Sequence, residues 1–380
     1  MAETIAKDFS TPEAKKYNAI KNFLYIAETL VLIMVLSAVT VLGLSIFLRA
    51  YLRMIFDSPI ILNAGFFFLF SLCMSILFLP VELYEGFILE HHFKLSTQSF
   101  FNWLKDYGKK SAITFFIGLC IVESVYVLIA YLPSAWWLYA AIVWLFLTLF
   151  LTKIFPYAIL PLFFKSKVLP EGALKERLYR LAATFSFSLS DILVLELSAK
   201  TNKANAMVTG IGTTKRIYVS DTLLKDFTDE EIELVIAHEL VHNRNQDIYK
   251  HIFVSCAVSM VSFYCCDLFL NRAVAYFGYS AKNDIATMPL LLLLFITAGL
   301  CMLPLQNGFS RRLEVNADRG AIATTRNPKA FIAMMIKLGK KNLAEFQPHR
   351  LIEIFLYDHP PLWRRISYAQ AMLKSTAMVS

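Results

Sequence analysis

A short motif in the middle of the chain has the residue types and spacing of a metal-dependent hydrolase. His238, Glu239, Leu240, Val241 and His242 follow one another as H-E-x-x-H. On a helix, the two imidazoles lie one turn apart on the same face, where both can bind one zinc ion. Glu239 beside them is a candidate general base for activating water. The motif therefore predicts a metal, a base and a hydrolytic reaction.

Two histidines need a further protein ligand to hold zinc at a catalytic site. Downstream, Glu314 and Asp318 stand four positions apart, so a helix places both carboxylates on one face. Glu314 is then a candidate ligand, and Asp318 can accept the outer N–H of a ligating histidine and so fix its tautomer. The alternative is a solvated helix face neutralised by Arg311, Arg312 and Arg319. The upstream motif favours the ligand interpretation.

The composition places this chemistry in a membrane. Of the 380 residues, 57% are hydrophobic and 17% are charged, and the mean hydropathy is +0.55. In soluble domains about a quarter of the residues are charged. Long apolar runs alternate with polar stretches, and each run is long enough to cross a bilayer as a helix. We predict about six spans, namely Phe23 to Leu48, Pro59 to about Leu83, Ala112 to Leu132, Ala135 to about Leu162, Ile252 to Leu270 and Ala286 to Leu305.

Six crossings place both termini and the polar segments on one side of the membrane. That side is rich in lysine, whereas the opposite side offers only Arg49, Arg53, Arg272 and Lys282. The positive-inside rule therefore predicts a catalytic side in the cytoplasm, in a prokaryotic cytoplasmic membrane or, alternatively, in the endoplasmic reticulum membrane. Membrane lipids with anionic headgroups account for the net charge of +8. We expect no nucleic-acid partner, because the basic residues are scattered and form no nucleic-acid-binding motif.

One polar segment, residues 163–251, is large enough to form a small domain. Its β-rich stretches are Ile192 to Leu197, Asn205 to Thr209 and Arg216 to Ser220, and a helical pattern from Pro170 to Phe185 precedes them. These stretches predict a small antiparallel sheet in front of the H-E-x-x-H segment. The motif itself is expected on a helix.

A capping box predicts where that helix starts, because Thr228 stands three residues before Glu231.

Together these features predict a mainly α multi-pass membrane protein with about six transmembrane helices and a small α+β zincin-like catalytic domain. The expected division is 1–162 for four spans, 163–251 for the catalytic domain, 252–306 for two further spans and 307–380 for a helical segment completing the zinc site.

Further blocks stand in a fixed order around the two motifs. They are Leu169 to Gly172, Asp221 to Leu224, and His359 to Leu362 followed by Arg365 and Ile366. In order and spacing, the chain from about Leu79 to Ile366 resembles the type I CAAX prenyl protease family, which are membrane-embedded zinc endopeptidases of the gluzincin class. It is more distantly similar to the HtpX-type membrane proteases.

The resemblance implies one zinc ion held by His238, His242 and Glu314, with Glu239 activating the water. It also implies that His359 stabilises the oxyanion that forms during peptide hydrolysis. The alternative for His359 is a residue of a proline-rich turn with no part in the reaction.

Further residues are assigned to substrate binding by the resemblance alone. It implies that Asn205 and Ala206 hold the substrate as an added β-strand, through main-chain hydrogen bonds that make little demand on sequence. It places Arg365 near the site. One departure is Asp247, since the prenyl proteases usually carry a further histidine five residues after His242, whereas HtpX-type enzymes carry an aspartate as here.

The expected function is a membrane-embedded zinc metalloendopeptidase that hydrolyses prenylated CAAX-type or membrane-associated peptides. An alternative is a quality-control protease for misfolded membrane proteins. A third hypothesis is a non-catalytic membrane chamber or scaffold with a structural zinc site. The presence of Glu239 argues against that third hypothesis, because a structural site needs no general base.

Overall fold

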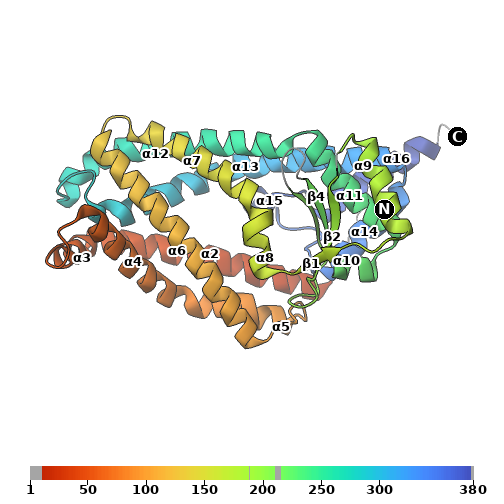
Figure 1. The fold of residues 1–380 in the computed structure, drawn as a ribbon, viewed down its shortest axis with the longest axis horizontal. Helices are drawn as coiled ribbons and strands as arrows, with labels where there is room; N and C mark the ends of the chain where they lie inside the picture. Colours follow the sequence, from red (N-terminus) through yellow and green to blue (C-terminus); the bar gives the residue numbers. More distant parts are fainter. Residues whose placement is uncertain (1–10, 188, 210–214, 378–380) are drawn as a thin grey trace.

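The computed structural model describes residues 11–187, 189–209 and 215–377 (Figure 1). Long helices run along the molecule, and a small sheet lies toward one end with shorter helices around it (Figure 1). Six helices within the described ranges are long and apolar enough to cross a membrane: Pro12–Val41, Pro59–His92, Phe100–Tyr131, Trp136–Phe163, Asp247–Phe277 and Ile285–Thr325. The predicted fold class, a mainly α multi-pass membrane protein with a small sheet, is confirmed.

The first predicted span differs from the observed one at both ends. Helix α2 (Pro12–Val41) begins earlier, because the side chain of Thr11 caps it and Pro12 occupies its first position. It ends before Gly43, which adopts a φ of +67°. Glycine tolerates this left-handed conformation, and a separate helix, α3 (Leu44–Arg53), starts there. An unbroken apolar run does not reveal such a break.

The other spans continue beyond their apolar runs. Helix α4 (Pro59–Leu83) passes through a π-helical segment, η1 (Tyr84–Leu89), into α5 (Glu90–His92). Helix α6 (Phe100–Tyr131) follows, and then α7 (Trp136–Ile154), η2 (Phe155–Ile159) and α8 (Leu160–Phe163) form one further rod. The last two spans are α12 (Asp247–Phe277) and α13 (Met288–Thr325), the latter preceded by a single turn, η4 (Ile285–Thr287).

Helix α13 is the longest of these helices, with 38 residues. At 1.5 Å per residue it is about 57 Å long, roughly twice the thickness of a bilayer's hydrocarbon core. Its second half therefore extends out of the membrane region, and this extension carries Glu314 and Asp318. The predicted span ended at Leu305 because only the first half is apolar.

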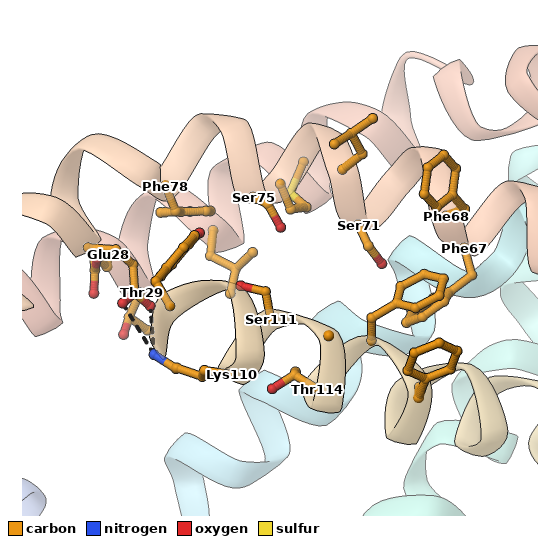
Figure 2. Close-up of a pocket in the computed structure, with 18 of the residues that line it drawn as sticks. Glu28, Thr29, Phe67, Phe68, Ser71, Ser75, Phe78, Lys110, Ser111 and Thr114 are labelled. Atoms are coloured by element: carbon orange, nitrogen blue, oxygen red, sulfur yellow. Dashed lines mark hydrogen bonds and ion pairs between the residues drawn. The ribbon is translucent and has the colours of Figure 1, made fainter. Parts of the chain in front are cut away.

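The membrane region contains a mostly apolar pocket with several polar side chains in its lining. A cavity of about 690 Å³ opens among α2, α4 and α6. Figure 2 shows polar side chains around it, with Phe67 and Phe68 at one end and Phe78 near the other; the polar residues are Glu28, Thr29, Ser71, Ser75, Ser111 and Thr114. Polar groups at membrane depth are usually placed toward such an interior space rather than toward lipid.

The sheet has four strands in the order β1-β2-β4-β3. Their bounds are β1 Ser166–Val168, β2 Asp191–Leu195, β3 Ala206–Thr209 and β4 Arg216–Ser220. The prediction of a purely antiparallel sheet is wrong, because β2 pairs with β4 in parallel, while β1–β2 and β3–β4 are antiparallel. The physical reason is that β3 lies on the outer side of β4, so that β2 and β4 become neighbours running in one direction. The short exposed strand β1 carries no alternating pattern and was not predicted.

Helices from two distant parts of the chain enclose the sheet (Figure 1). Before the last two spans these are α9 (Ala173–Thr184), α10 (Asp221–Asp226) and α11 (Asp229–Arg244). After them come α14 (Pro328–Lys341), α15 (Arg350–Leu356) and α16 (Leu362–Ala377). Buried residues of β4, α11, α13, α14 and α16, such as Ile217, Leu234, Ala317, Phe331 and Ala369, belong to one hydrophobic core. The end of α13 is thereby packed against the helix that carries H-E-x-x-H.

Candidate metal and active site

Helix α11 presents the H-E-x-x-H motif as predicted. Its first turn is fixed by a capping box: the Glu231 backbone N–H donates to Thr228 Oγ1 (3.3 Å) and the Thr228 backbone N–H donates to Glu231 Oε2 (2.9 Å). Ile232, Leu234 and Ile236 are buried and anchor the helix in the core. The motif on the last two turns is therefore held by a helix that is secured at its start and along its apolar face.

Two histidines and one carboxylate converge at the end of this helix. His238 Nε2 lies 3.1 Å from His242 Nε2 and 3.3 Å from Glu314 Oε2, and His242 Nε2 lies 3.2 Å from Glu314 Oε1. These three residues form a group whose ligand atoms all lie within 4.8 Å of one another. The structure thus brings together the three residues that the sequence suggested as ligands.

This donor set fits a tetrahedral zinc ion. Ligand atoms about 2.0–2.1 Å from zinc are about 3.3–3.4 Å from each other, close to the separations observed here. Glu314 Oε2 is buried and, among the described residues, accepts no hydrogen bond of good geometry, although His238 Nε2 lies 3.3 Å away. An unsatisfied buried carboxylate oxygen is costly, and a cation bound beside it removes that cost. The two nitrogens and the carboxylate therefore have the chemistry and the spacing of a metal site.

A buried ion pair between Asp318 and Arg365 contacts His238 through its second ring nitrogen, Nδ1. Asp318 Oδ1 lies 3.0 Å from His238 Nδ1. The guanidinium of Arg365 binds the same carboxylate in a bidentate manner, with Nε donating to Oδ2 (2.7 Å) and Nη2 donating to Oδ1 (2.6 Å). All three side chains are buried. Such an arrangement fixes the orientation of an imidazole and leaves its Nε2 free toward the cluster.

The carboxylate of Asp247 contacts His242 as that of Asp318 contacts His238. In the sequence, Asp247 stood out only as a departure from the prenyl proteases. Asp247 Oδ2 lies 2.9 Å from His242 Nδ1, and Lys250 Nζ donates to Asp247 Oδ1 (2.8 Å). The chain turns between α11 and α12 at Gln246, which has a φ of +56°. A spacing of five residues does not lie on one helix face, so helical periodicity gave no signal for this contact.

The carboxylates around the two imidazoles make this position attractive to positive charge. Burial by itself lowers the pKa of His238, but Asp318 and Glu314 outweigh it and raise that pKa to about 9 when no ion is bound. Burial likewise opposes the charged form of His242, and Glu314 and Asp247 raise its pKa overall.

His359 reaches the cluster from the segment between α15 and α16. Its Nε2 lies 3.3 Å from Glu314 Oε1, and its Nδ1 lies 2.7 Å from Asp358 Oδ1. The side chain is about half exposed, at 52%. It is the most exposed member of the group, since His238 and Glu314 are buried and His242 is partly buried, so a molecule approaching from solvent meets His359 first.

A pocket connects the cluster to the edge of the sheet. About 500 Å³ in volume, it is lined by Glu239 and His242 of α11, by Val208 and Thr209 of β3, and by residues of α7 and η2. Within the described parts of the chain, β3 is an edge strand, because its only neighbour in the sheet order is β4.

The residues suggested for substrate binding take two different places. Asn205 directly precedes β3 and Ala206 begins it, so both lie at this edge. Arg365 does not, since its guanidinium is buried against Asp318.

Comparisons with known proteins agree with this geometry. Residues 169–373 match the model of peptidase family M48, and residues 3–165 match a model described as the CAAX prenyl protease N-terminal region with five membrane helices. A Bacillus subtilis protein named as an uncharacterized metalloprotease, YhfN, is 31% identical over 365 residues, which cover 94% of this chain and 84% of that protein.

Two further matches are more distant in sequence. The human CAAX prenyl protease 1 homolog is 27% identical over 354 residues, covering 81% of this chain and 73% of that protein. The crystal structure of S. mikatae Ste24p has the same fold, with a TM-score of 0.80 at 24% identity over 94% of this chain and 86% of that one.

Proposed function

Since this chain belongs to peptidase family M48, and is a multi-pass membrane metalloprotease of the CAAX prenyl protease type, we propose that it hydrolyses prenylated CAAX-type or other membrane-associated peptides with one zinc ion. The observation that carries the proposal is the convergence of His238, His242 and Glu314 beside Glu239, at a pocket bounded by the free edge of β3. The same elements that hold the metal ligands thus adjoin the surface that can hold an extended peptide.

His238, His242 and Glu314 are the proposed metal ligands. A bound zinc ion lowers the pKa of water toward about 7 and polarises a carbonyl group. The protein then has to hold the three ligand atoms in place. Their separations of 3.1–3.3 Å support the assignment of these three residues as ligands.

Glu239 is the proposed general base. It follows His238 on the same helix, and it lines the pocket together with His242 and Val208. From there its carboxylate takes the proton of the attacking water and passes it to the departing amine. Among the described residues, the group of converging ligand atoms is made by His238, His242 and Glu314 and does not include Glu239.

Asp318, Arg365 and Asp247 are proposed as positioning residues. The carboxylates of Asp318 and Asp247 hold the outer nitrogens of His238 and His242, and Arg365 neutralises Asp318. We therefore propose for Arg365 a role behind the metal site in place of the substrate contact suggested by the resemblance. Its guanidinium is buried, and its Nε and Nη2 donate to Asp318.

His359 is the proposed stabiliser of the oxyanion. It is exposed toward solvent and its Nε2 lies at the edge of the ligand group. A cationic or N–H-donating imidazole there stabilises negative charge developing on the scissile carbonyl oxygen.

The substrate is proposed to bind as an added strand beside Asn205 and Ala206. Main-chain hydrogen bonds at an open sheet edge accept many sequences, which also suits a quality-control role toward unfolded membrane proteins. The excess of lysine on the side of the site supports a cytoplasmic orientation in a prokaryotic membrane, with the endoplasmic reticulum as the alternative.

The test uses the full-length protein purified in detergent. Zinc content is measured together with cleavage of a quenched farnesylated CAAX peptide and of unfolded casein, for the wild type, for Glu239→Gln and for Glu176→Gln, an exposed glutamate on α9. We expect about one zinc per chain in all three proteins and cleavage by the wild type and Glu176→Gln only. Equal cleavage by Glu239→Gln, or a wild type without zinc, would refute the proposal.

The two substrates separate the two physiological roles. A preference for the farnesylated peptide over its unmodified counterpart supports CAAX processing. Comparable cleavage of casein and of both peptides supports quality control.

A further inference from the structure

A basic cavity of about 840 Å³ lies beside the second half of α13. Its charged lining residues come from three helices: Arg311 of α13, Arg350 and Glu353 of α15, and Arg364 of α16. Three guanidinium groups thus face one carboxylate, which leaves two positive charges in excess. None of these residues belongs to the proposed zinc site, and the cavity shares no lining residue with the pocket that contains Glu239.

The one carboxylate of the lining is already paired. Both oxygens of Glu353 accept from Arg364, Oε1 from Nη1 (2.8 Å) and Oε2 from Nη2 (3.3 Å). Arg311 Nη1 donates only to main-chain carbonyl groups, those of Glu353 (2.8 Å) and Tyr357 (2.6 Å). Arg350 is exposed and, within the described part of the chain, makes no hydrogen bond or ion pair. Two of the three guanidinium groups therefore lack an anion.

The cavity lies close to the depth of the lipid headgroups. Arg311 is six residues beyond Leu305, where the apolar half of α13 ends, and this separation is about 9 Å along the helix. The headgroup layer on one side of a bilayer is about 5–8 Å thick. Asn307 Nδ2 donates to the carbonyl of Phe355 (2.7 Å), so α15 is attached to α13 within the same layer.

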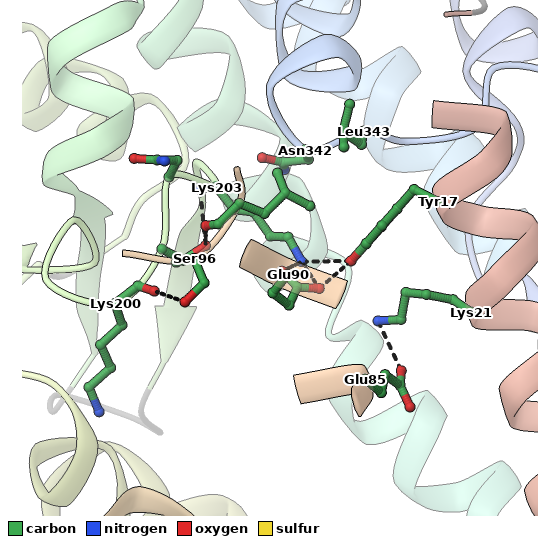
Figure 3. Close-up of polar contacts among 12 residues, drawn as sticks. Tyr17, Lys21, Glu85, Glu90, Ser96, Lys200, Lys203, Asn342 and Leu343 are labelled. Atoms are coloured by element: carbon green, nitrogen blue, oxygen red, sulfur yellow. Dashed lines mark hydrogen bonds and ion pairs between the residues drawn. The ribbon is translucent and has the colours of Figure 1, made fainter. Parts of the chain in front are cut away.

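The segment that leads into α15 is attached to the first turns of α2. Asn18 Nδ2 donates to the carbonyl of Leu343 (2.7 Å). Leu343 also packs against Tyr17 of α2, and Figure 3 shows these two side chains together. Both α2 residues precede Phe23, where the first apolar run starts. The chain from 343 to 355 is thus held near the membrane surface at both ends.

Helix α15 presents apolar side chains next to the basic cavity. Leu351 is 59% exposed and Phe355 is 43% exposed. They stand four positions apart and so share one face of the helix. Ile354, between them in sequence, lines the cavity. An exposed apolar face beside excess positive charge, at the membrane surface, suits contact with the acyl chains and the headgroup of an anionic lipid.

We propose that this cavity binds the phosphate of an anionic phospholipid headgroup, with the acyl chains of the lipid against Leu351 and Phe355. Phosphate oxygens accept paired hydrogen bonds from guanidinium groups, which matches the two arginines without an anion, Arg311 and Arg350. A zwitterionic lipid brings its own positive charge into a cavity that already has an excess of it. The site therefore distinguishes anionic from zwitterionic lipids.

The test measures lipid binding by the full-length protein after lipid has been removed in a neutral detergent. Dissociation constants are determined by native mass spectrometry for phosphatidylglycerol and phosphatidylcholine, with inorganic phosphate as a competitor in a separate series. The binding variant is Arg350→Gln. Arg312→Gln is the matched control, because Arg312 is exposed next to Arg311, does not line the cavity and, among the described residues, has no hydrogen bond or ion pair.

A third variant, Glu353→Gln, should act in the opposite direction. It makes the paired carboxylate of the lining neutral, so it raises the positive charge of the cavity and should tighten the binding of phosphatidylglycerol. Melting temperatures show which variants fold. Arg350→Gln should melt as the wild type does, because it loses no contact among the described residues, and it carries the test if Glu353→Gln does not fold.

The wild type and Arg312→Gln should bind phosphatidylglycerol equally well, and at least about tenfold more tightly than phosphatidylcholine. Arg350→Gln should weaken the binding of phosphatidylglycerol about fivefold, the effect of one cation near an anionic lipid. Inorganic phosphate should not displace the lipid at comparable concentration, because it has no acyl chains to place against α15.

Three outcomes would overturn the inference. Equal affinity for the two lipids excludes a site that selects anionic headgroups. Equal weakening by Arg350→Gln and Arg312→Gln means that the lipid responds to the charge of the whole surface and not to this cavity. Displacement by inorganic phosphate at comparable concentration, weakened in Arg350→Gln, makes a soluble phosphate the ligand in place of a lipid. All three outcomes leave the proposed zinc site unaffected, since no readout depends on cleavage.

Discussion

Gly320 of α13 lies directly against Val241 of α11, inside the H-E-x-x-H motif. A Cβ added to Gly320 would lie 2.8 Å from both Cγ atoms of Val241, closer than such atoms approach in proteins. Valine cannot move aside easily, since its side chain is stiff at χ1. This contact sets how closely α13, and with it Glu314, approaches the two histidines.

The first prediction concerns this contact. Gly320→Ala should push α13 away from α11 and cost about 1–3 kcal/mol of stability, as overpacked cores do, with a matching loss of zinc affinity. Thermal unfolding and zinc titration check both effects. Gly299→Ala in the same helix is the control, because a Cβ there meets no atom within 4 Å. Equal behaviour of the two variants would show that the close approach is not required.

The second prediction concerns the carboxylate behind His238. Asp318→Asn keeps the shape of the side chain but leaves Arg365 as a buried charge without its anion. We expect a loss of zinc affinity of about 10–100-fold and a destabilisation of about 3–5 kcal/mol. Zinc competition titrations and denaturant unfolding measure these separately. A variant that loses neither would remove the positioning role from Asp318.

The third prediction concerns Asp247. Asp247→Ala should lower zinc affinity about 10–100-fold, because His242 loses the partner that orients it. Lys250→Ala removes the other partner of Asp247 and is exposed, so it should bind zinc nearly as the wild type does. Should both variants bind zinc equally, the contact between Asp247 and His242 has no part in the site.

The fourth prediction concerns metal removal. Dialysis against a chelator should lower the melting temperature, and zinc in hundredfold excess over its dissociation constant should restore about 2.7 kcal/mol. Glu239→Gln should show the same restoration, since the base is not a ligand, whereas His238→Ala should show little. Stabilisation of His238→Ala by zinc to the wild-type extent would contradict the proposed ligand set.

The features that could be predicted from the sequence are those that depend on residues close together along the chain. Apolar runs report membrane helices, and the capping box of Thr228 and Glu231 reports a helix start, because both signals are local. The convergence of Glu314 with the histidines was also foreseeable, since a metal site needs a third ligand and few carboxylates have suitable spacing.

The features that sequence did not predict depend on tertiary packing. The parallel pairing of β2 with β4 follows from the outer position of β3, which no strand pattern encodes. The contact of Asp247 with His242 depends on a sharp turn at Gln246. Asn342 meets Ala204 across more than a hundred residues of chain, so its place at the sheet edge is visible only in the folded structure.

The order of the proposed ligands along the chain has a consequence for biogenesis. His238 and His242 precede α12, whereas Glu314 follows the membrane-embedded part of α13. The two halves of the site therefore meet only after the α12–α13 hairpin has entered the bilayer and returned. A newly made chain that has not yet inserted holds separated ligands and no competent centre. With the proposed ligands in this order, completion of the metal group depends on prior insertion of the α12–α13 hairpin.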